Sequence, residues 1–216
     1  MSDLLTTIAL YALPVILAIT LHEAAHGYVA RMFGDMTATK AGRVTLNPLP
    51  HIDLVGTIVV PLSILLASRL MGGPPLLFGW AKPVPVNFGN LHNPKKDMLW
   101  VALAGPASNL VMAVLWALIL RLVFESGSGH SSYLFQMAVV GVQINLVLMA
   151  LNLFPLPPLD GGRIVYSLLP HQLAWQYGRI EPYGMMILIV LLVTDNLWPL
   201  LRPFMALGRW IVEFFL

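Results

Sequence analysis

Residues 21–27 read LHEAAHG and lie within an apolar stretch long enough to cross a membrane. If this stretch is helical, His22 and His26 lie on the same face, because residues four apart are neighbours on a helix surface. Two imidazoles at this spacing can bind one zinc ion, and Glu23 beside them can take a proton from a zinc-bound water. An ionisable side chain costs roughly 2.5 kcal/mol or more at the membrane centre, so three within five positions indicate a shared purpose. The stretch therefore predicts a metal site inside a membrane span.

The composition is that of a polytopic membrane protein. Of the 216 residues, 58% are hydrophobic and 10% are charged, whereas a soluble domain carries about 25% charged residues. The mean hydropathy is +0.79. The basic residues are scattered among loops, which argues against nucleic acid as a partner, and the lack of cysteine leaves His, Asp and Glu as metal ligands. We expect a single integral-membrane domain, residues 1–216, in the lipid bilayer.

Apolar runs predict an all-α polytopic membrane protein with about five or six transmembrane helices. The expected spans are residues 4–33, 52–70, 98–123, 134–154 and 183–197. The tail, residues 199–216, is a sixth span or an interfacial helix. The metal site and its surroundings fall in a core at about 4–165, and C-terminal helices follow at about 171–216.

The basic residues predict the orientation of these spans. Arg31, Lys40 and Arg43 follow the first span and nothing basic precedes it, so residues 34–51 should be cytoplasmic. His22 and His26 then fall in the cytoplasmic half of the span. Lys95 and Lys96 should be cytoplasmic as well, so the chain between must cross and return.

Only one helix is visible in that part of the sequence, which predicts a short extended or re-entrant membrane segment. Repeated prolines exclude a regular helix in residues 72–97, and residues 82–87 should be extended. Non-helical backbone at membrane depth must be buried in protein or line a wet cavity, so we expect residues 72–90 to form a wall of the metal site. Residues 36–50, rich in Thr and Val, predict a short strand pair at the membrane surface.

Two histidines leave a catalytic zinc one protein ligand short, since such sites usually have three plus a water. The candidate is Asp160, which follows the prolines that end the 134–154 span and precedes Gly161 and Gly162, where the chain can turn tightly. The alternative is that Asp160 caps the helix that follows it. Because Asp160 and the histidines are all expected on the cytoplasmic side, the role of third metal ligand is favoured over that of a helix cap.

Other polar residues have weaker claims. Asn152 lies two turns before Asp160 and can donate a hydrogen bond to the oxyanion on a substrate carbonyl. Asn109 and Asn145 are expected to hydrogen-bond neighbouring helices. The remaining acids and histidines lie near span ends or in loops, and we expect the histidines to be solvated or interfacial: His51, His92, His130 and His171.

With these motifs in order, the chain resembles the site-2 proteases, which are intramembrane zinc metalloproteases. The resemblance rests on residues 22–26 (HEAAH), 105–109 (GPASN), 152–160 (NLFPLPPLD) and 159–161 (LDG). It is to the small form without a PDZ or CBS domain. A multi-pass protein of a bacterial or archaeal plasma membrane is then expected.

The resemblance implies one zinc per chain, bound by His22, His26 and Asp160, with Glu23 as general base and Asn152 assisting at the substrate. The implied partners are transmembrane segments of other membrane proteins, which the family cleaves. We expect residues 82–87 to hold an unwound substrate by strand addition, although Pro83 and Pro85 leave only one edge able to pair.

Two other functions fit parts of the pattern. Intramembrane His and Asp also mark the ion pathways of metal transporters, but here they form no ladder across the bilayer, and Glu23 would have no role. An inactive relative that only binds membrane proteins is the other alternative, and the presence of Glu23 argues against it.

Overall fold

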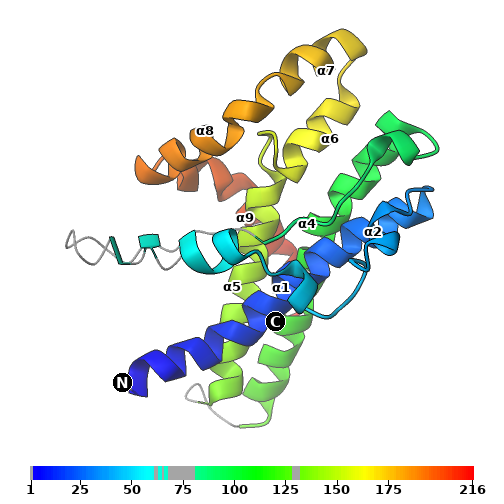
Figure 1. Ribbon diagram of the computed structural model, residues 1–216. Helices are drawn as coiled ribbons and strands as arrows, with labels where there is room; N and C mark the ends of the chain where they lie inside the picture. Colours follow the sequence, from blue (N-terminus) through cyan, green and yellow to red (C-terminus); the bar gives the residue numbers. More distant parts are fainter. Residues whose placement is uncertain (1, 61–62, 65, 68–80, 128–131) are drawn as a thin grey trace.

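The fold is all-helical in the residues that the computed structural model describes, which are 2–60, 63–64, 66–67, 81–127 and 132–216 (Figure 1). The α-helices are α1 (Ser2–Met32), α2 (Thr37–Lys40), α4 (Pro94–Glu125), α5 (Tyr133–Leu153), α6 (Asp160–Leu168), α7 (His171–Gly178), α8 (Glu181–Val193) and α9 (Leu197–Glu213). Short 3-10 or π turns are η1 (Leu49–His51), η2 (Leu54–Val59) and η3 (Phe88–Asn90).

Three of the described helices are long and apolar enough to cross a membrane: α4, α5 and the Ala9–Met32 part of α1. They match the expected spans at 4–33, 98–123 and 134–154, except that α4 starts earlier, with Pro94 in its first turn. The three helices pack against one another through small residues. Ala113 is fully buried, and Gly141 lies against the Trp116 ring, where no side chain would fit. Close backbone approach of this kind is the usual basis of helix packing in membranes.

The expected count of five or six spans is not confirmed. α8 has 13 residues, so it is about 20 Å long, short of the roughly 30 Å of a bilayer core. α8 and α9 meet at an angle of 95° and together are at most one broken span. The described residues therefore hold three spans, or four with this pair, and the span expected at 52–70 lies partly outside the described residues. The tail forms most of α9, which packs on α5 where Gly208 admits Leu146 and Met149.

The strand pair expected at 36–50 is wrong. The segment forms α2, a turn with Gly42 at φ +65°, and the 3-10 turn η1. The reason is local. The Asp35 carboxylate accepts the N–H of Thr37 and starts a helical turn, and prolines at 48 and 50 lack the N–H donors that a strand ladder needs.

The Pro-rich segment is extended where the structure describes it, over residues 81–87; the expectation for residues 72–80 lies outside the described residues. At the Asn87 end of this segment, the backbone is bonded to Asp35. This carboxylate is fully buried and accepts hydrogen bonds from Asn87 N–H (2.8 Å), Asn90 Nδ2 (3.1 Å), and both the N–H and the hydroxyl of Thr37. Burial alone would raise the pKa of Asp35, but the hydrogen bonds from Thr37, Asn90 and Asn87 outweigh it and hold this pKa below its usual value.

We expect Asp35→Ala to lower the free energy of unfolding by about 3 kcal/mol, because the four hydrogen bonds to this buried carboxylate are lost at roughly 0.5–1.5 kcal/mol each. Thermal unfolding in detergent measures this.

The pKa of Asp35 is lower in the folded state, so the stability that this carboxylate contributes should depend on pH. It should be complete above about pH 4 and disappear as the pH falls below that. Glu125→Ala, which breaks only an exposed pair with Arg121, is the control. Equal effects of the two variants would contradict this account.

Candidate metal centre

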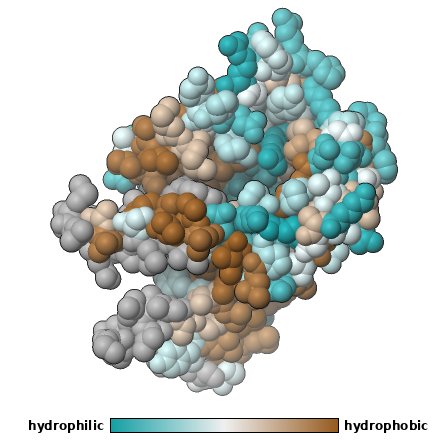
Figure 2. Space-filling view, viewed as in Figure 1, coloured by the Kyte–Doolittle hydropathy of each residue, from teal (hydrophilic) through white to brown (hydrophobic). Residues whose placement is uncertain are grey.

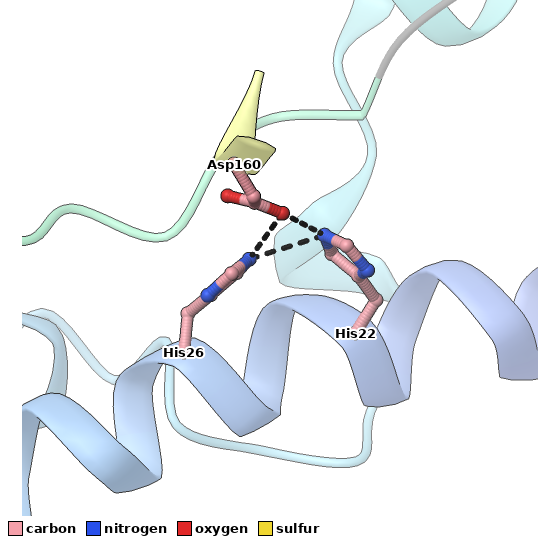
Figure 3. A group of neighbouring side chains, drawn as sticks. All are labelled: His22, His26 and Asp160. Carbon is pink, nitrogen blue, oxygen red and sulfur yellow. Dashed lines mark hydrogen bonds and ion pairs between the residues drawn. The ribbon is translucent and has the colours of Figure 1, made fainter. Parts of the chain in front are cut away.

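Three side chains from two distant parts of the chain converge on one point (Figure 3). His22 and His26 project from the same face of α1, and Asp160 projects from the first turn of α6. The Asp160 Oδ2 atom lies 3.2 Å from the Nε2 atom of each histidine, and the two Nε2 atoms lie 3.1 Å apart. All three residues are buried. The expected helical face and the expected third partner are therefore both present.

The other nitrogen of each ring fixes its tautomer. His22 Nδ1 lies 2.7 Å from Asn109 Oδ1, and His26 Nδ1 lies 2.7 Å from the Val101 carbonyl oxygen. Both partners are oxygens that only accept, so each Nδ1 carries the proton. Each Nε2 is then left with a free lone pair directed at the other histidine and at Asp160. This is the arrangement in which metal-binding histidines are usually held.

The orientation of Asn109 is itself set by a chain of buried amides. Its Nδ2 donates to the Ala18 carbonyl (3.1 Å) and to Asn145 Oδ1 (3.0 Å), which turns Oδ1 toward His22. Asn145 in turn donates to the Gly141 carbonyl in its own helix (2.8 Å). The expectation that Asn109 and Asn145 bond neighbouring helices is correct, but the role of Asn109 toward His22 was not foreseen. The sequence feature that could have indicated this role is the position of Asn109 four residues after Gly105, on the same face of α4.

The three donor atoms suit a zinc ion. Two neutral imidazole lone pairs and a carboxylate oxygen 3.1–3.2 Å apart repel one another unless a cation lies among them. The buried Asp160 Oδ2 has no hydrogen-bond partner in the described part of the chain. Tetrahedral zinc with bonds of about 2.0–2.1 Å separates its ligand atoms by about 3.3 Å, which is close to the observed spacing.

Gly105 makes room for the centre. A Cβ atom at this position of α4 would overlap the Nε2 atoms of both His22 and His26. A helix interior normally favours alanine over glycine by about 1 kcal/mol, so the glycine is explained by the space it leaves. α4 thus contributes an empty face as well as the Asn109 and Val101 acceptors.

Asp160 is held by close backbone packing. It is the first residue of α6, and the structure shows no side-chain cap from it, so the capping alternative is not what places it. A Cβ at Gly161 would overlap the Leu153 and Phe154 carbonyl oxygens, and one at Gly162 the backbone of Pro157. The two glycines therefore allow the start of α6 to pack closely against the end of α5 and the segment that follows it.

Glu23 and Asn152 face the same cavity beside the metal centre. The cavity has a volume of about 200 Å³ and is also lined by His22 and Ala81. Glu23 Oε2 accepts the Val84 N–H at 2.7 Å. Asn152 Nδ2 donates to the Leu148 carbonyl of its own helix at 3.0 Å, so one of its two N–H groups is already used.

Most backbone N–H groups of the extended segment already have hydrogen-bond acceptors, among them the Glu23 carboxylate. Of the four N–H groups in residues 82–87, Val84 donates to Glu23, Lys82 to the His51 carbonyl and Asn87 to Asp35. The fourth, the Val86 N–H, has no hydrogen-bond partner among the described residues. Arg43 also donates to the Lys82 and Pro83 carbonyls. In this conformation, strand addition to a substrate through the three used N–H groups is excluded.

The remaining histidines follow expectation in part. His92 and His171 are exposed, as expected. The expectation is wrong for His51, which is 2% exposed, because η1 folds it under the extended segment, with Nε2 3.2 Å from the Thr45 carbonyl. His130 lies outside the described residues.

Comparisons with known proteins show the family of this chain. The model of "Peptidase family M50" matches residues 123–194. The protein named "Putative zinc metalloprotease YwhC", from Bacillus subtilis, is 41% identical over 196 residues, covering 87% of this chain and 84% of that protein. The chain belongs to the site-2 protease family.

Two further relatives carry similar names. "Putative zinc metalloprotease Rip2" of Mycolicibacterium smegmatis is 29% identical over 198 residues, covering 92% of this chain and 68% of that protein. "Putative zinc metalloprotease MJ0611" of Methanocaldococcus jannaschii is 38% identical over 65 residues, covering 30% of this chain and 31% of that protein. No solved structure matches the chain significantly. Family membership supports a membrane-embedded zinc metalloprotease.

We expect Gly105→Ala to abolish zinc binding by this site-2 protease while the helices remain folded, since the new methyl group overlaps both Nε2 atoms. Zinc per chain, measured by elemental analysis of detergent-purified protein, should fall from about one to near zero. Ser108→Ala is the control, because its hydroxyl bonds only the Gly105 carbonyl of the same helix. Full zinc content in Gly105→Ala would show that the histidines bind the metal elsewhere.

Asn109→Leu should weaken zinc binding about 10- to 100-fold, because His22 loses the acceptor that fixes its tautomer. Asn109→Asp keeps an acceptor oxygen and should retain most of the affinity. Competition with a chromogenic chelator measures both variants, and Asn196→Leu at an exposed position is the control. If Asn109→Leu and Asn196→Leu bind zinc equally, the amide chain has no part in holding the metal.

Proposed function

We propose that this chain is an intramembrane zinc endopeptidase that hydrolyses peptide bonds in transmembrane segments of other membrane proteins. The observation that carries the proposal is the cavity shared by Glu23 and His22, which opens beside the metal centre within the span of α1. A base and a metal ligand thus face one space large enough for a short stretch of substrate.

The walls of this cavity suit an apolar substrate. Apart from the polar groups of His22, Glu23 and Asn152, the lining side chains are apolar: Ile19, Ala81, Leu148, Leu151, Leu159, Met185 and Leu188. They come from α1, α5, α8 and the segments before α4 and α6. Side chains of a membrane-spanning peptide would be buried here without loss of apolar contact.

The chemistry follows from the residues that meet at the cavity. Zinc held by His22, His26 and Asp160 would polarise a carbonyl and lower the pKa of a bound water. Glu23 would accept the proton of the attacking water and deliver it to the leaving nitrogen. The Val84 N–H fixes one carboxylate oxygen of Glu23, so the base is already oriented before a substrate arrives.

Asn152 would assist at the carbonyl oxygen of the scissile bond. Its second N–H group remains for the developing negative charge, since the first is donated to Leu148. Its place on the same cavity as Glu23 supports this role. Relatives in bacteria and in an archaeon support a multi-pass location in a prokaryotic plasma membrane.

We expect Glu23→Gln to lower the cleavage rate of a single-span reporter peptide at least a hundredfold, which is within the usual range for loss of a general base. Zinc per chain should stay near one, because Glu23 is not among the ligand atoms. The assay uses purified protein reconstituted with the reporter in lipid, and gel analysis detects the fragments.

Glu125→Gln, an exposed carboxylate far along α4, is the matched control and should cleave normally. Equal cleavage by Glu23→Gln and wild type would remove Glu23 from the mechanism. Zinc uptake into proteoliposomes without cleavage would instead favour a metal transporter. Zinc binding without cleavage or uptake would favour an inactive relative.

A further inference from the structure

A second cavity, of about 440 Å³, lies where α6, α7 and the start of α8 meet η3 and the first turns of α4. Its lining includes Phe88, Arg163, Trp175, Arg179 and Glu181. It shares no lining residue with the cavity of Glu23 and His22. Arg163 lies one turn after Asp160 in α6, and Leu159, the residue just before α6, lines the cavity of Glu23 and His22. We call this space the headgroup pocket.

Two guanidinium groups in the headgroup pocket are available for an anion. The Arg163 Cζ atom lies 5.2 Å from the centroid of the Phe88 ring, and the Arg179 Cζ atom lies 5.3 Å from that of Trp175. Among the described residues, neither guanidinium group has a carboxylate within 4.0 Å or a hydrogen-bond partner. Stacking on a ring leaves the N–H edge of a guanidinium free to bind phosphate oxygens. Glu181 contributes one negative charge to the lining, so the pocket stays net positive.

The pocket lies at the level where α4 begins. Met98, one turn from Pro94, forms part of its lining, and Lys95 Nζ donates to the Leu169 carbonyl at the end of α6. This is the end of the molecule for which the basic residues predict the cytoplasmic surface. Trp175 is 64% exposed beside the pocket, and aromatic side chains of this kind gather at membrane–water interfaces.

An open apolar groove continues from the headgroup pocket along α8. It has a volume of about 530 Å³ and is lined by Gln176 and Arg179 at one end and by Ile180, Tyr183 and Ile187 along α8. Arg179 therefore stands at the junction of a basic cavity and a groove of apolar side chains. Figure 2 shows the same transition, with hydrophilic residues over the α6–α7 end and hydrophobic residues toward the far end of α8.

We propose that this junction binds an anionic membrane phospholipid. Arg163 and Arg179 bind the headgroup phosphate, and an acyl chain lies along Ile180, Tyr183 and Ile187. The groove is what favours a lipid over free phosphate, because a free ion would use the basic cavity alone. Since α6 starts at Asp160, a bound lipid braces the helix that carries the third metal ligand. The proposal requires the membrane location but not the protease activity.

The test is a titration of the detergent-purified full chain with phosphatidylglycerol, with bound lipid counted by native mass spectrometry. The Arg163→Gln/Arg179→Gln variant should bind at least about tenfold more weakly than wild type, since each lost charge-assisted contact is worth about a factor of ten. Arg209→Gln, an exposed arginine on α9, is the matched control for charge and should bind as wild type does. Zinc content near one in all variants shows that the metal centre stays intact.

Equal lipid binding by the double variant and the Arg209→Gln control would overturn the proposal. A second arm uses inorganic phosphate as competitor. If phosphate at millimolar concentration displaces the lipid completely and binds with the same dependence on Arg163 and Arg179, the site is a phosphate site and the lipid proposal fails. Ile180→Asn/Ile187→Asn, which makes the groove polar, should weaken lipid binding severalfold and leave phosphate binding unchanged.

Discussion

The close approach of three side-chain atoms that could bind one metal ion is the constraint on which the structure depends. His22, His26 and Asp160 meet at 3.1–3.2 Å and are buried, so water and salt screen them much less than they would at a protein surface. Bringing them together requires α4 to lie against α1 with no side chain at Gly105. It also requires the start of α6 to lie on the end of α5. The packing of four helices is thus tied to one small volume, and a cation there turns repulsion into attraction.

Hydrogen bonds to backbone carbonyls orient the two histidines. The Gly141 carbonyl orients Asn145, which orients Asn109, which sets the tautomer of His22. Val101 sets His26 in a single step. A buried amide in a membrane has no water as an alternative partner, so each member of such a chain has one low-energy orientation. In this way, backbone carbonyls on α1, α4 and α5 determine where the Nε2 lone pairs of His22 and His26 point.

The parts of the site that follow from local spacing could be predicted from the sequence. His22 and His26 share a helical face, and Asp160 follows a Pro-rich helix end at the matching membrane depth, so all three were expected. The contact of Asn109 with His22 could not be predicted, since it depends on which face α4 turns to α1. The strand pair at 36–50 was wrong because composition did not reveal that Asp35 would accept the Thr37 N–H. The span count is not confirmed at α8 and α9, where hydropathy does not show the bend between the two helices.

The three ligands differ in how firmly the protein holds them, and this difference bears on how such a site can be tuned. Each histidine is bonded through Nδ1 to α4, and Glu23 is bonded to Val84, so α1 is fixed from two sides. Asp160 has no hydrogen bond to a backbone group in the described residues and depends on the packing of α6 against α5. A shift of α6 would therefore move the Asp160 carboxylate relative to the two histidines. Arg163 is one turn away and lines the headgroup pocket, so this pocket and the candidate metal centre are linked by a single turn of helix.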